Sequence, residues 1–125
     1  MIRIALWLAV MAAAWSGGAL AQAWPQKQVR VLVGLAPGGN PDTLARILAA
    51  KWSGALGQQF VVENRPGAGS TTAADLTAKS PPDGLTVLIS DSSVITTAPH
   101  LFKSLPYDPF RDLQPVSLAG SWNTS

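Results

Sequence analysis

The chain has 125 residues, no cysteine, one histidine and a formal net charge of +2. The lack of cysteine excludes disulfides, thiolate metal sites and thiolate catalysis. A single histidine with no acidic cluster beside it indicates no metal site, and the dispersed lysines and arginines do not form the basic patch that a nucleic-acid surface needs. We therefore expect no metal, no cofactor and no nucleic-acid partner.

The first 23 residues have the composition of an export signal. One positive charge, Arg3, precedes an apolar run over residues 4–15, and overlapping small-x-small sites follow at residues 19–21 and 21–23. This order is typical of a cleaved secretory signal peptide, whereas a membrane anchor needs about 20 apolar residues. We predict a signal peptide over residues 1–23, cleaved after Ala23, with cleavage two residues earlier as the alternative.

The mature chain begins with a strand and a long helix. Residues 29–35 are β-branched and apolar, which predicts a buried strand of the parallel type, and the proline- and glycine-rich residues 37–41 end it. Apolar residues at helical spacing between positions 44 and 56 predict a helix. Asp42 is expected to cap its start, and Gly57 to end it in the left-handed conformation.

The same succession then repeats. Residues 59–64 predict a second strand, and residues 65–70 form a second glycine-rich turn. One of the hydroxyl residues at positions 70–72 is expected to cap a short helix that runs to Lys79. The pattern indicates a second strand–turn–helix unit like the first.

The remaining residues predict more strand than helix. We expect a third strand at residues 86–90, a helical turn at 99–102, a loop at 107–112 and a fourth strand at 113–118. Strands alternating with helices favour right-handed βαβ units. The predicted fold class is therefore α/β, with a mainly parallel sheet.

Polar or glycine-rich segments follow all three of the first predicted strands, at residues 37–42, 64–70 and 90–93, and together they could hold a carboxylate or a phosphate. Open α/β sheets bind ligands at the carboxyl ends of their strands, where glycines admit a ligand close to the backbone and helix amides attract anions. The expected ligand-binding residues are Pro37, Gly38, Gly39, Asn40, Asp42, Ser90, Ser92 and Ser93. The alternative interpretation is that the glycines only form tight turns between strands and helices.

Three single residues each allow two interpretations. Asp42 could cap the helix, contact a ligand, or do both. Arg65 could pair with a carboxylate substrate, but pairing with Glu63 or with solvent is favoured. His100, between Pro99 and two apolar residues, fits a helix start or packing better than a general base. No dinucleotide, P-loop or nucleophile-elbow motif occurs, so we predict that the protein is not an enzyme.

Short motifs along the mature chain resemble the substrate-binding receptors of tripartite tricarboxylate transporters, the Bug family. The segments that carry the resemblance are residues 24–25, 37–42, 62–69, 82–86, 99–102, 105–109 and 112–117. The resemblance implies a two-lobed, type II periplasmic-binding-protein fold and a periplasmic location. It also implies a small organic carboxylate as ligand and the membrane permease subunits of the transporter as partners.

The resemblance implies roles for two of the loops as well. The loop from Gly38 to Asp42 would contact the carboxylate, and residues 90–93 would line the same cleft. Ser70 stands where family members commonly have glycine. Residues 24–125 would form a partial first lobe, so we expect a fragment of a receptor. The alternative is a small exported α/β enzyme or interaction module built on the same strands.

Overall fold

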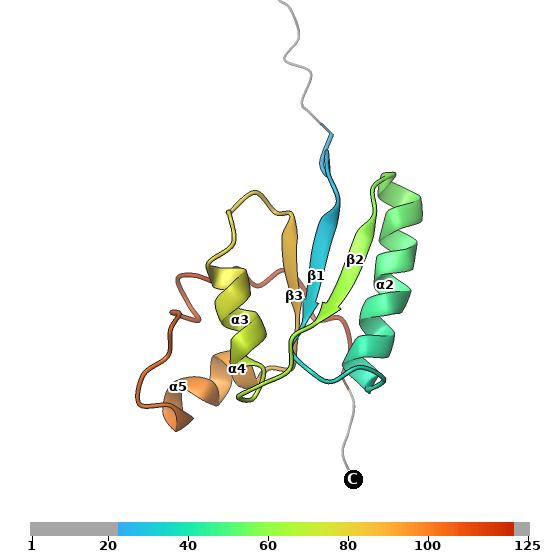
Figure 1. Ribbon diagram of the computed structural model, residues 1–125. Helices are drawn as coiled ribbons and strands as arrows, with labels where there is room; N and C mark the ends of the chain where they lie inside the picture. The colour runs from blue at the N-terminus through green and yellow to red at the C-terminus, as the bar shows by residue number, and fades with distance from the viewer. Residues whose placement is uncertain (1–22, 122–125) are drawn as a thin grey trace, which may run out of the picture.

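The computed structural model describes residues 23–121 (Figure 1). The apolar run and both small-x-small sites of the predicted signal peptide begin or lie within residues 1–22, so that prediction falls outside the described residues. The elements in chain order are β1 (Val29–Val33), α2 (Asn40–Leu56), β2 (Phe60–Asn64), α3 (Thr71–Ala78), β3 (Thr86–Ile89), α4 (Ser93–Thr96) and α5 (Ala98–Leu101).

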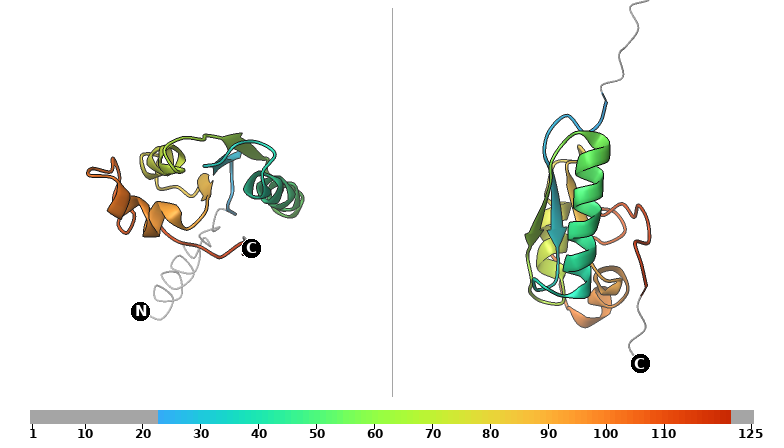
Figure 2. Two further views of the ribbon diagram at one scale, coloured as in Figure 1. Left: turned by 90° about the horizontal axis from the view of Figure 1, so that it is seen from below. Right: turned by 90° about the vertical axis from the view of Figure 1, so that its right-hand side faces the viewer.

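The strands form one parallel sheet in the order β2-β1-β3. Val33 at the end of β1 lies opposite Asn64 of β2 and Ile89 of β3, so all three strands end at the same edge. Helix α2 packs on β1 and β2, and α3 packs on β1 and β3. Seen along the strands, the two helices cover opposite faces of the sheet (Figure 2). The predicted α/β fold with a parallel sheet is confirmed.

The core follows from the alternation of side chains along β1. Every second residue of this strand faces α2, and these valines are fully buried with two helix alanines and an aromatic ring of β2: Val29, Val31, Val33, Ala45, Ala49 and Phe60. A second cluster under α3 joins Ala74, Val94 and Tyr107. Burying a valine or leucine contributes about 1.5–3 kcal/mol, so the central strand anchors the sheet edge from which the loops leave.

The start of α2 differs from its prediction, whereas its end does not. Gly57 is left-handed with φ +71°, and its N–H donates to the Ser53 carbonyl, as expected of a C-cap. The N-cap is Gly39, so Asp42 is the third helical residue, and its carboxylate accepts the N–H of Gly38, the residue before the cap. The prediction of Asp42 as the cap is wrong because Pro41 has its φ preset for a first helical turn, and the helix starts before it.

Two shorter helices also differ from expectation. Ser70 occupies the N-cap position of α3, but it is left-handed, with φ +67°, and its hydroxyl makes no capping bond. Helix α4, which follows the third strand almost at once, was not predicted. Its start is organised by Asp91, which accepts hydrogen bonds from the N–H and the hydroxyl of Ser93. The helical turn predicted at 99–102 is confirmed as α5, one residue earlier.

The predicted fourth strand at residues 113–118 is wrong. This segment pairs with no strand within the described part of the chain, and Val116 and Leu118 are 91% and 83% exposed. Pro115 lies in its middle, and a proline has no N–H to donate to a strand ladder. Within residues 23–121, no helix is both long enough and apolar enough to cross a membrane.

Candidate functional site

Gly34, the first residue after β1, contacts both the end of β3 and the loop after β2. Its N–H donates to the carbonyl of Ile89, the last residue of β3, at 3.4 Å. Its carbonyl accepts the hydroxyl of Ser70, from the loop after β2, at 3.1 Å. The three strands thus end together at the carboxyl edge, the lower end of the sheet in Figure 1, and the first and third predicted site segments both start from this edge.

Gly34 and Ser70 approach so closely that only glycine fits at position 34. A Cβ atom built there would lie 2.5 Å from the Ser70 Cβ and 3.1 Å from its Cα. Ser70 is only 2% exposed, and its left-handed backbone costs about 1 kcal/mol for a residue other than glycine. The Ser70 hydroxyl therefore joins the second loop to the first instead of capping α3.

A polar network built on Asp42 holds the first glycine loop. One carboxylate oxygen, Oδ2, accepts the Gly38 N–H at 2.9 Å and the Arg46 Nε at 3.0 Å. The other, Oδ1, accepts the Asn64 side-chain amide at 2.9 Å. Asp42 is 3% exposed, so almost all of its hydrogen-bonding capacity is taken up by these protein donors.

These donors also keep Asp42 ionised. The Arg46 guanidinium, the Gly38 N–H and the Asn64 amide, in that order, lower the pKa of the Asp42 carboxyl from 3.8 to about 2. Hydrogen bonds to the charged form of a carboxyl stabilise that form. Asp42 is therefore a carboxylate over the physiological pH range, and its charge is balanced locally by Arg46.

The rest of the first loop is open to solvent. Residues 36–40 are exposed, and in the described part of the chain the amides of Gly39 and Asn40 make no hydrogen bond. A Cβ at Gly39 would meet only the Ala36 carbonyl and the Pro41 ring, at 3.7 and 3.8 Å. Amides at the start of a 17-residue helix attract anions.

The third predicted site segment, residues 90–93, contains three serines in different states. The hydroxyl of Ser93 is bound to Asp91, whereas Ser92 is exposed and its carbonyl accepts the Thr96 hydroxyl at 3.0 Å. The Ser90 hydroxyl oxygen is buried and finds no hydrogen-bond partner among the described residues. Of the three, Ser90 and Ser92 keep hydrogen-bonding capacity for another group.

A groove of about 320 Å³ lies beside the second glycine loop. Its lining is almost entirely apolar and comes from that loop and from α4 and α5: Ala68, Gly69, Ser93, Thr97, Ala98, Leu101 and Phe102. A second hollow, of about 260 Å³, includes Trp24 and Lys27 and lies at the amino ends of the strands. Only the first of these shares a residue, Ser93, with the predicted site.

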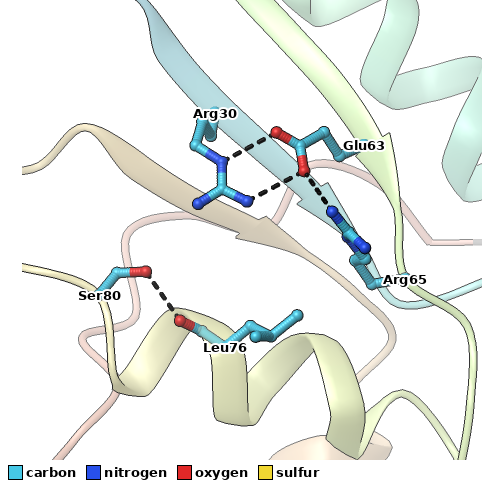
Figure 3. Close-up of polar contacts among 5 residues, drawn as sticks. All are labelled: Arg30, Glu63, Arg65, Leu76 and Ser80. Atoms are coloured by element: carbon cyan, nitrogen blue, oxygen red, sulfur yellow. Dashed lines mark hydrogen bonds and ion pairs between the residues drawn. The ribbon is translucent and has the colours of Figure 1, made fainter.

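Arg65 is bound to Glu63, as the sequence favoured. The Glu63 carboxylate accepts a bidentate pair of bonds from Arg30, at 2.8 and 3.0 Å, and one from Arg65 at 3.1 Å (Figure 3). The Arg30 guanidinium is the main cause that lowers the pKa of Glu63 to about 2. Figure 3 also shows the Ser80 hydroxyl bound to the Leu76 carbonyl, at the end of α3.

Sequence reasoning placed Asn64 in the second exit segment without a role of its own, and it missed Arg46. Two signals pointed to them: the i,i+4 spacing of Asp42 and Arg46 on one helix, and an uncharged polar residue at the end of a strand, next to the second glycine turn. Across residues 23–121, no group of three or more acidic or histidine side chains could hold a metal ion.

Known proteins resemble this chain in sequence. Residues 44–124 match the family described as the tripartite tricarboxylate transporter family receptor. Protein BugT of Bordetella pertussis is 43% identical over 101 residues, which are 80% of this chain and 31% of BugT. A protein of Bordetella bronchiseptica is 42% identical over 99 residues, 79% of this chain and 30% of that protein. The chain thus spans about a third of the length of these relatives.

Solved structures resemble it in fold. MatC of Rhodopseudomonas palustris, solved with bound malate, is 40% identical with a TM-score of 0.71, over 77% of this chain and 33% of MatC. An R. palustris protein solved with adipate is 39% identical with a TM-score of 0.66, over 70% of this chain and 29% of that one. The periplasmic binding protein BugD is 37% identical with a TM-score of 0.66, over 71% of this chain and 29% of BugD. By sequence and by fold, this chain belongs to the tripartite tricarboxylate transporter receptor family.

Proposed function

We propose that this chain is part of a periplasmic receptor that binds a small organic carboxylate and delivers it to the permease subunits of a tripartite tricarboxylate transporter. Family membership supports the receptor role, and the malate and adipate in two similar structures support a carboxylate ligand. Residues 1–23 would be the signal peptide, and residues 24–125 part of the first lobe of a type II binding-protein fold.

One observation carries the choice of ligand class: the exposed start of α2, where the amides of Gly39 and Asn40 make no hydrogen bond among the described residues. Pro37 and Gly38 shape this loop, and Ser90, Ser92 and Ser93 would line the same cleft from the loop after β3. A carboxylate that accepts the two amides would gain from the helix dipole as well.

Asp42 has a different part in this proposal. Its oxygens already accept three protein donors, and a ligand carboxylate would be repelled by it at close range. We therefore assign Asp42 to holding the loop, with ligand contact left to Gly39, Asn40 and the serines. A cleft receptor surrounds most of its ligand, so residues 24–125 alone should bind weakly.

Saturation-transfer NMR on the exported protein tests the proposed function. Malate and adipate at millimolar concentration are the probes, and their dimethyl esters, which carry no charge, are the matched controls. We expect transfer to at least one acid and to neither ester. Transfer to no acid, or equal transfer to acid and ester, would contradict carboxylate recognition.

Export is tested separately by N-terminal sequencing of the protein recovered from the periplasm. The proposal predicts a mature chain that begins at Trp24, or at Gln22 if the earlier small-x-small site is used. A recovered protein that still begins at Met1 would contradict the cleaved signal.

A further inference from the structure

Asn64 is the last residue of β2, and its side chain lies on the same sheet face as α2. The register places it opposite Val33, one residue before the first loop. Its side-chain Nδ2 donates to the Leu35 carbonyl at 3.2 Å and to Asp42 Oδ1 at 2.9 Å. Its Oδ1 accepts Arg46 Nη2 at 3.2 Å. One side chain of β2 thus contacts both the loop after β1 and the helix that follows it.

The chemistry of these partners requires an amide. The Leu35 carbonyl and the Asp42 carboxylate only accept, and the Arg46 guanidinium only donates. An aspartate at position 64 would have no donor and would set a second negative charge against Asp42, while a leucine would satisfy none of the partners. Only asparagine supplies a donor and an acceptor at this length.

We infer that Asn64 is the positioning residue of the first glycine loop. It holds the Asp42 carboxylate where it accepts the Gly38 N–H, and this bond sets the direction in which the next amides, of Gly39 and Asn40, face solvent. Asn64 also holds the loop backbone directly, through its hydrogen bond to the Leu35 carbonyl. The identity of the ligand bound by the loop rests on the proposed function. The role of Asn64 in fixing the loop conformation is independent of that function.

The test is hydrogen exchange at the Gly38 amide, followed by NMR in the exported protein. The variants are Asn64→Leu, which removes all three bonds, and Asn64→Asp, which keeps the size and removes the donor. The control is Gln58→Leu, because it removes another side-chain amide bond to a backbone carbonyl, that of Gln26, at the opposite end of β2. Amides of Val31 and Val61, which face the neighbouring strand in the β1–β2 ladder, report on the sheet.

We expect Gly38 exchange to rise by about tenfold or more in both Asn64 variants, since losing a hydrogen bond to a charged acceptor has at least that effect. Exchange of the two sheet amides, and of Gly38 in Gln58→Leu, should stay near that of the unmodified protein. Unchanged Gly38 exchange in both Asn64 variants would overturn the inference. Equal acceleration of the sheet amides, or failure of both variants to fold, would also overturn it, because Asn64 would then stabilise the whole fold.

A second readout adds the ligand. Where the unmodified protein binds malate or adipate, both Asn64 variants should bind it at least about tenfold more weakly and Gln58→Leu equally well. Unchanged affinity together with accelerated Gly38 exchange would show that Asn64 fixes the loop conformation but does not affect ligand binding. If the unmodified protein binds neither acid, the proposed function fails, and Gly38 exchange still decides the role of Asn64.

Discussion

The two glycine-rich loops at the carboxyl edge look alike in sequence and differ in construction. The first loop is held by side chains from α2 and β2 through Asp42, and its last residues are exposed before a helix of 17 residues. The second bends through left-handed residues, among them Ala68 and Ser70, into a helix of eight. Its hydroxyls bond inward: Ser70 to the Gly34 carbonyl, and Thr71 to the Ala68 carbonyl at 2.8 Å.

The difference assigns the loops separate tasks. The first keeps amides directed outward at the positive end of a long helix, as an anion site requires. The second loop packs a buried side chain, Ser70, against Gly34 at the end of β1 and so stabilises the start of the first loop. Gly34 leaves room for a neighbouring residue, Ser70, whereas on the proposed function Gly39 leaves room for a ligand.

The largest effect should come from the contact between the loops. Gly34→Ala would place its Cβ 2.5 Å from the Ser70 Cβ, and because Ser70 Cα is also close, no rotamer change relieves the clash. We expect a loss of about 3 kcal/mol in the free energy of unfolding, measured by urea denaturation. The double variant Gly34→Ala/Ser70→Gly should recover part of it. A fully stable Gly34→Ala protein would contradict this packing.

A matched pair of substitutions separates the tasks of the loops. Gly39→Val meets only ordinary contacts and, because valine is a poorer N-cap than glycine, should lower the stability by about 1 kcal/mol at most. Its side chain should block the loop amides and weaken carboxylate binding by about tenfold or more. Gly69→Ala, at φ +62°, should lower the stability by about 1 kcal/mol and leave binding unchanged. Calorimetry measures the binding and thermal melts measure the stability of each variant. Weaker binding in Gly69→Ala with unchanged binding in Gly39→Val would assign the ligand to the second loop instead of the first.

Acid should weaken the fold through two carboxylates. The pKa values of Asp42 and Glu63 are about 2 in the folded protein, against ordinary values of 3.8 and 4.5. Because the unfolded chain binds protons first, stability is fully present above about pH 5 and falls as the pH drops toward 2. Urea midpoints between these pH values measure the decline. Asp42→Asn should make it shallower, and an identical slope would remove Asp42 from the network.

The smallest effect is expected at Arg65. Its bond to Glu63 is single and its side chain is half exposed, whereas Arg30 already holds both carboxylate oxygens. Exposed ion pairs of this kind contribute about 0–1 kcal/mol, so Arg65→Ala should change stability by less than that and leave carboxylate binding unaltered. A clear loss of binding in this variant would return Arg65 to the ligand site.

The fold could be predicted from local patterns, whereas much of the site could not. Apolar runs at residues 29–35 and 59–64 mark buried strands without knowledge of their neighbours, and Gly57 marks a helix end by its own conformational freedom. Asn64 acts through Leu35, Asp42 and Arg46, which are far from it in sequence, so its role depends on strand register.

Two of the wrong assignments have local causes that outweighed the pattern used. Pro41 starts α2 before Asp42, which therefore cannot cap the helix. Pro115 removes a ladder donor from the predicted fourth strand, although its apolar residues resemble those of a strand. The role of Ser70 could not be predicted from the sequence, because it depends on the close contact between Ser70 and Gly34 in the folded chain.

The most direct test of carboxylate binding at the first loop is a two-dimensional NMR titration of the exported protein with malate and with adipate. The account predicts saturable amide shifts at Gly39 and Asn40, with smaller shifts at residues 90–93, and no such shifts with the dimethyl esters. Saturable shifts confined to the groove at Ala68 and Gly69, or no saturable shift with either acid, would contradict it.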